Sequence, residues 1–299
     1  MCNIAGYIGS KNSTPILLEM IKKQEGLNGG FYTGIAVHNG KTIDYKKVQG
    51  DLAVLLETTS AEKLVGSTGI AHSRTPSGGN ALWAHPFTAE RDNEVKICYV
   101  ANGARASFAD GLEFCNKIAD SMVASGYDIP NKLNIQGSIY NHLSTGESLH
   151  MSDVICQRIY QYIDNGKTPV DAMTSAYLEM PGEIVGLMLE KNSPNCIYYS
   201  RINRPMFVGF DGDGAYLASS PMAFFESVKE YKLLPALSSG VIYKDGYETF
   251  PYSEFSKTVA PFDGNMIENA KTVIVNLLKD GTITVKNIFN ALDKIISNL

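Results

Sequence analysis

The chain opens with Met1-Cys2-Asn3-Ile4-Ala5-Gly6-Tyr7-Ile8-Gly9, an apolar, strand-like run with a cysteine directly after the initiator methionine. Methionine aminopeptidase tolerates a small second residue, and its action leaves a thiol and a free α-amine together on Cys2. That amine can serve as the thiol's own general base and so activate it as a nucleophile. Alone this is a weak signal, because isolated motifs often arise by chance, so the rest of the chain has to support it.

The other cysteines do not suggest a shared site. There are five in all, an odd number at wide spacing with no C-x-x-C pair, which argues against a disulfide framework and a zinc site. The remaining four lie in apolar or helical patterns, where a thiol usually acts as a small hydrophobic group. They are Cys98, Cys115, Cys156 and Cys196. We expect no metal and no cofactor.

Length and composition set wide limits on the fold and exclude some partners. The chain has 299 residues, 44% of them hydrophobic, enough for one large core or two modest ones. With a formal net charge of -5 and no basic cluster, nucleic acid is not an expected partner. No leader pattern opens the chain and no apolar run approaches about 18 residues, so we expect no membrane contact and a cytoplasmic location.

Apolar periodicity predicts strands before and after a helical middle section. The Asn39-Gly40 dipeptide indicates a two-residue hairpin turn. Stacked antiparallel sheets with helices outside them fit this order. The predicted strands are 3–9, 34–37, 41–45, 68–72, 184–189, 196–200, 206–210, 215–218 and 241–243; the predicted helices are 14–23, 52–56, 108–124, 152–163, 169–178 and 222–228; residues 128–148 are a predicted loop.

The last forty residues differ in character from the rest. Residues 266–278 and 285–299 each carry an apolar stripe at helical spacing. These helices either pack on their own domain or dock onto a partner subunit. We therefore divide the chain into a main domain, 1–258, and a helical extension, 259–299.

Three further motifs follow the opening one in the same order as in a known family. Gly69 to Gly79 (GIAHSRTPSGG) resembles G-I-x-H-T-R-W-A-T-x-G, Ala84-His85-Pro86 resembles A-H-P, and Val100-Ala101-Asn102-Gly103 resembles V-H-N-G. Together they resemble the class II glutamine amidotransferases of the N-terminal-nucleophile hydrolase superfamily, and most of all the glutaminase half of glucosamine-6-phosphate synthase. The likeness spans about residues 2 to 255 and implies an α+β fold, a four-layer αββα sandwich of two antiparallel sheets.

The resemblance assigns a role to each motif. Cys2 is the implied nucleophile, and the Asn102 side chain and the Gly103 backbone N–H are the implied oxyanion donors. Arg74 has the planar fork that matches a carboxylate, so it is the candidate clamp for the glutamine α-carboxylate. Without the family resemblance, the sequence predicts a turn at Asn102-Gly103 and an ordinary ion-pair role for Arg74.

Other motif residues have supporting roles. Thr75 and Ser77 follow Arg74 in the same motif and are counted with it as substrate-binding residues. His72 and His85 are expected to be structural hydrogen-bonders rather than acid–base catalysts, because the α-amine already fills that role.

Several positions depart from the family pattern. Thr75, Ser77 and Ala101 replace a large aromatic residue, Thr and His. The family's S-D-T-E-V-I region, whose Asp holds the glutamine α-ammonium, is matched by residues 150–155, which puts Met151 at the Asp position. Either Asp153 or Glu147 supplies that charge, or the substrate lacks a free α-amine, or activity is weak.

A second departure lies near the start of the chain. Residues 29–34 (GGFYTG) resemble R-G-Y-D-S-A-G with its Arg and Asp gone. In the family those two residues help order the surroundings of the nucleophile.

The expected activity is hydrolysis of the glutamine side-chain amide, through a thioester on Cys2, with ammonia handed to a synthase. The sequence has no sugar-isomerase-like stretch and no G-x-x-x-x-G-K-[ST] loop, so we expect a separate synthase subunit. Two alternatives stay open: an amidase on the same fold with another amide substrate, and a regulatory or binding module without turnover.

Overall fold

Two stacked antiparallel sheets form the centre of the molecule. The computed structural model describes residues 2–26, 28–76, 78–104, 111–135 and 140–253, with Thr272 and Asn276. The seven-stranded sheet has β1 and β4 near its middle, and every pairing in it is antiparallel. Its strands, in spatial order, are β13 (Tyr231–Leu233), β11 (Phe207–Phe210), β12 (Gly214–Ala218), β1 (Asn3–Gly9), β4 (Thr68–Arg74), β2 (Tyr32–His38) and β3 (Ile43–Gln49).

The second sheet has six strands and is also antiparallel throughout. In spatial order they are β15 (Gly246–Pro251), β14 (Ser238–Tyr243), β10 (Ile197–Arg201), β9 (Glu183–Glu190), β6 (Glu94–Ala104) and β5 (Phe87–Arg91). A small hairpin, β7 (Asn141–His142) with β8 (Ser148–Leu149), stands apart from both sheets.

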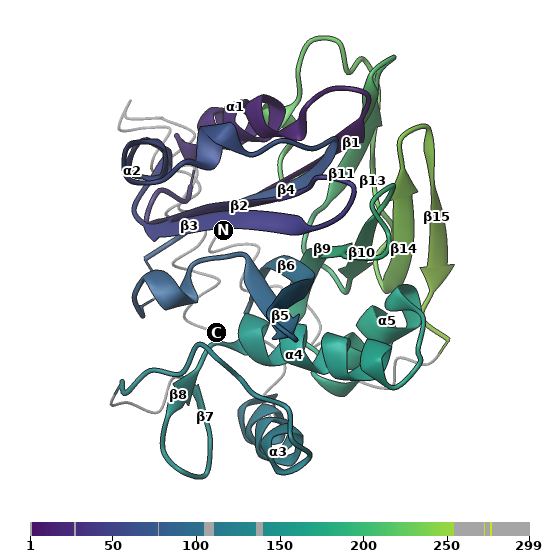
Figure 1. Ribbon diagram of the computed structural model, residues 1–299. Helices are drawn as coiled ribbons and strands as arrows, with labels where there is room; N and C mark the ends of the chain where they lie inside the picture. The colour runs from purple at the N-terminus through teal and green to yellow at the C-terminus, as the bar shows by residue number, and fades with distance from the viewer. Residues whose placement is uncertain are drawn as a thin grey trace.

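Helices cover the outer face of each sheet and make four layers, as Figure 1 shows. The seven-stranded sheet is covered by α1 (Ser13–Glu25) and α2 (Leu52–Thr58). The six-stranded sheet is covered by α4 (Met151–Asp164) and α5 (Pro169–Glu179), with α3 (Gly111–Ala124) packed beside α4. The described residues also contain three short 3₁₀ turns, at Ala61–Lys63, Ala81–Trp83 and Pro221–Ala223.

Each interface between layers is a separate apolar core. One cluster lies between the sheets and includes Ile4, Leu187 and Leu217. A second fills the space under α1, and a third lies between the six-stranded sheet and the helices α3 to α5. The predicted αββα sandwich is therefore confirmed.

Helix starts follow local capping chemistry. The Asn12 side chain accepts from the Thr14 N–H at the start of α1, and Thr168 does the same for the Asp171 N–H before α5, where Pro169 takes the first helical position. These side chains satisfy amide groups that a helix cannot pair internally.

Directed hydrogen bonds join the two sheets at their ends. His38 Nε2 lies 2.8 Å from the Lys191 carbonyl, and Thr68 Oγ1 donates to the Pro194 carbonyl at 2.7 Å. Apolar packing is non-directional, so such bonds are needed to fix how one sheet sits over the other.

Most predicted elements are confirmed within one to three residues, and a few are wrong. The hairpin between β2 and β3 has a four-residue connection, residues 39–42, instead of two residues. The predicted helix at 222–228 is only a 3₁₀ turn, and its apolar side chains Phe224 and Val228 belong to the core under α1. The predicted loop contains the β7–β8 hairpin, and the strands β5, β6, β13 and β15 were not predicted. The C-terminal helices and the boundary at residue 258 lie outside the described residues.

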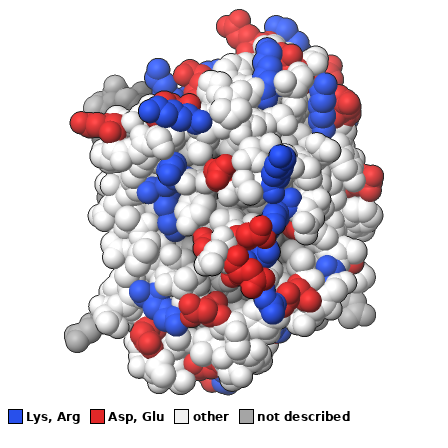
Figure 2. Space-filling view, viewed as in Figure 1, with Lys and Arg blue, Asp and Glu red and all other residues white. Residues whose placement is uncertain are grey.

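Charge is spread over the molecule. On the face shown in Figure 2, acidic and basic side chains are interspersed. Among the helices that the structure describes, none is long and apolar enough to cross a bilayer.

The inter-sheet core predicts a clear difference between two leucines. Leu187 is fully buried against Gly6, whereas Leu56 on α2 is 38% exposed. We expect Leu187→Ala to lower the free energy of unfolding by about 2–5 kcal/mol, since it leaves a cavity between the sheets. Denaturant titration checks this, with Leu56→Ala as the control at under about 1 kcal/mol. Equal losses in the two variants would contradict the packing described here.

Candidate active site

Cys2 lies at the start of β1, in the middle of the seven-stranded sheet and facing β6 of the other sheet. Its carbonyl oxygen accepts a hydrogen bond from Asn102 Nδ2 at 2.6 Å, and its sulfur lies 3.6 Å from Thr75 Oγ1. Cys2 is half-buried, whereas the other four cysteines are buried, and all five are free thiols. Of the five, Cys2 is thus the thiol with most access to a ligand.

Asn102 and Gly103 belong to a strand, so their interpretation as a turn was wrong. They sit near the end of β6, opposite Val185 and Ile184 of β9. A Cβ atom at Gly103 would come within 2.8 Å of the Ile184 side chain. Glycine therefore lets the two strands close together beside Cys2.

Arg74 ends β4 and is buried, with 2% of its surface exposed. Its guanidinium donates to the Trp83 carbonyl at 3.1 Å and the Gly78 carbonyl at 3.0 Å, and it stacks over the Tyr32 ring at 4.6 Å. Burial lowers the pKa of Arg74, while the neighbouring Cys2 thiol acts in the opposite direction. These bonds fix the guanidinium beside Cys2 rather than on the surface.

The loop after Arg74 folds back around it. Tyr32 donates its hydroxyl to the Gly79 carbonyl at 3.2 Å, and a Cβ atom at Gly79 would come within 2.4 Å of the Trp83 ring. Ser77, the other predicted substrate-binding residue of this loop, lies outside the described residues.

Three histidines gather behind the candidate site. The rings of His72 and His85 lie 4.0 Å apart, and those of His85 and His150 lie 5.5 Å apart. Burial lowers the pKa of His72 to about 3, with the Arg74 charge as a second cause, and burial also holds the pKa of His85 and of His150 well below the usual range. All three are therefore neutral near pH 7.

The histidines differ in their hydrogen bonds. His72 Nε2 lies 3.0 Å from the carbonyl of Ala101, as expected for a structural hydrogen-bonder. His150 caps α4 by accepting from the Ser152 N–H. Neither ring nitrogen of His85 has a hydrogen-bond partner within the described part of the chain. The predicted structural role is thus seen directly only for His72.

Asp153 lies one layer behind these groups. It is fully buried in the first turn of α4, and it accepts from the backbone N–H and side chain of Asn131 and from Gln157 Nε2. Burial raises its pKa. Asn131 in turn accepts from the Trp83 indole N–H at 2.8 Å, so Asp153 connects to the Arg74 loop through Asn131. No motif in the sequence pointed to this contribution of Trp83 and Asn131.

Met151 and Glu147 are the other two residues considered for the α-ammonium site. Met151 lies at the start of α4, and Glu147 lies in the small β7–β8 hairpin. Met151 is the first residue of α4 and packs partly buried against the core. Glu147 lies just before β8 and accepts from the Thr145 hydroxyl.

A polar network joins the segment that matches the start of the R-G-Y-D-S-A-G motif to its neighbours. Asn3 donates its side-chain amide to the Asn28 carbonyl, and the Ser73 hydroxyl donates to Glu25 at 2.9 Å. The Gly30 N–H donates to the same Ser73 oxygen at 2.8 Å. Burial raises the pKa of Glu25. Amide and carboxylate groups thus tie residues 28–30 to the strands beside Cys2.

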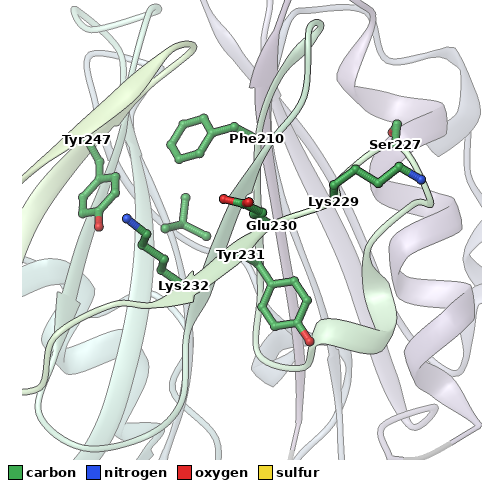
Figure 3. Close-up of a pocket in the computed structure, with 8 residues that line it drawn as sticks. Phe210, Ser227, Lys229, Glu230, Tyr231, Lys232 and Tyr247 are labelled. Carbon is green, nitrogen blue, oxygen red and sulfur yellow. The ribbon is translucent and has the colours of Figure 1, made fainter.

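A surface cavity of about 430 Å³ lies elsewhere, near β11, β13 and β15 (Figure 3). Its lining includes Phe210, Lys232 and Tyr247 but none of Cys2, Arg74 or Asn102. Because it holds none of the motif residues, the cavity is not the candidate active site.

Comparison with sequences of known proteins finds relatives with one shared name. The chain is 23% identical over 249 residues to glutamine–fructose-6-phosphate aminotransferase [isomerizing] of Thermococcus kodakarensis, and 28% identical over 251 residues to that of Caldanaerobacter subterraneus subsp. tengcongensis. Each match covers 83% of this chain but only 37% and 36% of the relative, so the chain spans less than two fifths of their length. No family model matches the chain.

Solved structures share the fold at low sequence identity. A glutamine phosphoribosylpyrophosphate amidotransferase from B. subtilis superposes with a TM-score of 0.64 at 17% identity, over 95% of this chain and 59% of that one. An allosteric regulatory enzyme of purine biosynthesis gives 0.66 at 16% identity, over 95% and 58%. The chain is thus similar in sequence to the glutamine–fructose-6-phosphate aminotransferases named above, and it shares the fold of the amidotransferase of known structure.

Proposed function

We propose that this chain hydrolyses the side-chain amide of glutamine, with Cys2 as nucleophile once Met1 has been removed. The observation that carries the proposal is the arrangement around Cys2: Asn102 2.6 Å from its carbonyl, Thr75 3.6 Å from its sulfur, and a buried Arg74 beside them. Nucleophile, oxyanion donors and a carboxylate clamp are the groups that amide hydrolysis with an amino-acid substrate requires.

The reaction has two stages. The Cys2 sulfur attacks the amide carbon while its α-amine accepts the thiol proton, and that proton then goes to the leaving nitrogen, which departs as ammonia. Water attacks the resulting thioester, giving glutamate and restoring the thiol. The α-amine accepts a proton from this water and returns it to the sulfur.

The oxyanion formed in each stage needs donors already in place. An amide nitrogen carries two hydrogens, so Asn102 Nδ2 can hold the Cys2 carbonyl with one and point the other at the oxyanion. The Gly103 backbone N–H is the second proposed donor, and Arg74 with Thr75 and Ser77 binds the substrate carboxylate.

The released ammonia needs an acceptor. The curated relatives are named as aminotransferases, and this chain matches less than two fifths of their length. We propose that a separate synthase subunit uses the ammonia, with the segment after residue 258 as its dock.

A second candidate is an amidase whose substrate lacks a free α-amine. It is favoured by the contacts of Asp153, whose carboxylate is engaged by Asn131 and Gln157, and by Met151 at the position where the family has an Asp. N-acetylglutamine separates the two candidates, because it has the same side-chain amide and no α-ammonium.

The buried histidines have no acid–base role in this reaction. A general base works best with a pKa near the operating pH, and burial holds the pKa of His72, His85 and His150 far below it. We propose instead that they keep the rear of the site uncharged beside Arg74.

Removing the Cys2 thiol is expected to abolish ammonia release from glutamine. Asn102→Ala is expected to lower kcat by about 10²–10³, the usual cost of losing one oxyanion donor. Cys2→Ala tests the first point, with the buried Cys196→Ala as a control that keeps activity. Intact mass should show Met1 absent from active protein. Full activity in Cys2→Ala, or in protein that keeps Met1, would disprove the proposal.

Arg74→Lys should raise KM for glutamine by about tenfold or more with a smaller change in kcat, because a point charge cannot replace the bidentate fork. Arg91→Lys, at an exposed ion-pair residue, serves as the control.

If N-acetylglutamine is hydrolysed and glutamine is not, the second candidate function replaces the first.

The neutral histidines predict that stability falls in weak acid. Their pKa is near 6.5 in the unfolded chain and far lower in the native protein, so below pH 6.5 the unfolded state binds more protons. From pH 7.5 to 5.5 each histidine should remove about 1.4 kcal/mol from the free energy of unfolding. The raised pKa of Glu25 and of Asp153 acts in the opposite direction.

Denaturant titration at the two pH values measures this loss. His85→Leu should reduce the loss by about 1 kcal/mol, since one titrating group is gone. His142→Gln, at an exposed position, should leave it unchanged. An equal loss in the wild type and in His85→Leu would contradict the buried, neutral state of the His85 ring.

A further inference from the structure

The segment from Leu82 to Pro86 is held from two sides by cationic side chains. Lys47 Nζ donates to the carbonyl of Leu82 at 3.0 Å, of Ala84 at 3.1 Å and of Pro86 at 3.3 Å. An ammonium has three N–H donors, so these bonds use all of them. The carbonyl between the first two, that of Trp83, points the other way and accepts from Arg74 at 3.1 Å.

The sheet is shaped to bring this segment close. Lys47 on β3 lies opposite Gly34 on β2. A Cβ atom at Gly34 would come within 2.1 Å of the His85 carbonyl, so glycine is what allows the segment to lie on the strand. The Lys47 ammonium also sits 5.1 Å above the Phe87 ring, just past the segment's end.

Partial burial of Lys47 disfavours its charged ammonium, and the three hydrogen bonds to carbonyls offset this cost. Burial lowers the pKa of the Lys47 ammonium, and the Asp153 charge is the largest factor in the opposite direction. Three carbonyl acceptors favour the charged form, so the lysine can act as a fixed donor.

We propose that Lys47 is a positioning residue for substrate binding: by holding the Leu82–Pro86 segment, it fixes the Trp83 carbonyl and through it the orientation of the Arg74 guanidinium. Lys47 touches no substrate in this scheme. The inference rests on the proposed function, in which Arg74 binds the carboxylate of glutamine. A bidentate contact depends on the plane of the guanidinium, so a small rotation weakens it.

Steady-state kinetics of Lys47→Met test the proposal, because methionine keeps the length of the side chain and removes every donor. We expect KM for glutamine to rise by about tenfold and kcat to stay within about threefold. A merely structural lysine would lower the amount of folded enzyme and leave KM unchanged. The control is Lys46→Met, which changes the neighbouring residue on the opposite face of β3 and should leave KM as it is.

A binding measurement separates this inference from the proposed function. Glutamate should protect Cys2 from alkylation by iodoacetamide, and Lys47→Met should need about ten times more glutamate for the same protection. If the wild-type protein shows this protection, Lys47→Met needs about ten times more glutamate for it, and glutamine is not hydrolysed, the proposed function fails and the role of Lys47 stands. If it hydrolyses glutamine and Lys47→Met keeps its KM and its protection, the role of Lys47 alone is wrong.

A second variant covers the case in which Lys47→Met does not fold. Lys47→Gln keeps two N–H donors on a shorter side chain and should raise KM by a smaller factor, about threefold. An unchanged KM in a folded Lys47→Gln protein would then overturn the proposal, as would an equal rise in Lys46→Met.

Discussion

The Asn102 side chain reaches from the six-stranded sheet to the residue just before β1 of the other sheet and donates to the carbonyl of Cys2. The apolar core between the sheets fixes their separation but leaves them free to slide, because hydrophobic contact has no preferred direction. The bond from Asn102, with that between His72 and Ala101, fixes the relative position at this end, as His38 and its partner do at the other. Everything proposed about catalysis needs that fixed position, since nucleophile and oxyanion donors come from different sheets.

The region around Cys2 is held by side-chain hydrogen bonds and by close backbone approach. Short amide and hydroxyl bonds join Asn3 to Asn28 and Ser73 to Glu25. The backbone at Gly29 lies against the same strands, since a Cβ atom there would lie 2.8 Å from both Asn3 and Ser73. Glycine at this position therefore allows the segment to pack beside Cys2.

The sequence predicted the layers because most of the strands and helices carry their own periodic apolar pattern, although β5 and β6 were not predicted as strands. The helix predicted at 222–228 failed because apolar residues there pack under α1 without forming a helix. β13 was missed because its three residues are all exposed, so it has no buried face to show in an apolar pattern. The candidate site residues Cys2, Arg74 and Asn102 were predicted from motifs. Lys47 and Asn131 were not predicted, because their contacts near the site involve backbone carbonyls. Every residue has a carbonyl, so no sequence pattern reveals such a contact.

Trp83 is the only tryptophan in the chain and is fully buried next to Arg74, with the rings of Tyr140 and His150 packed at its edges. Its backbone holds the proposed carboxylate clamp, and its indole donates to the Asn131 carbonyl. Indole emission responds to polarity and to neighbouring rings. The single indole therefore lies in the loop that holds the proposed clamp, and its intrinsic fluorescence reports on the conformation of that loop without any attached dye.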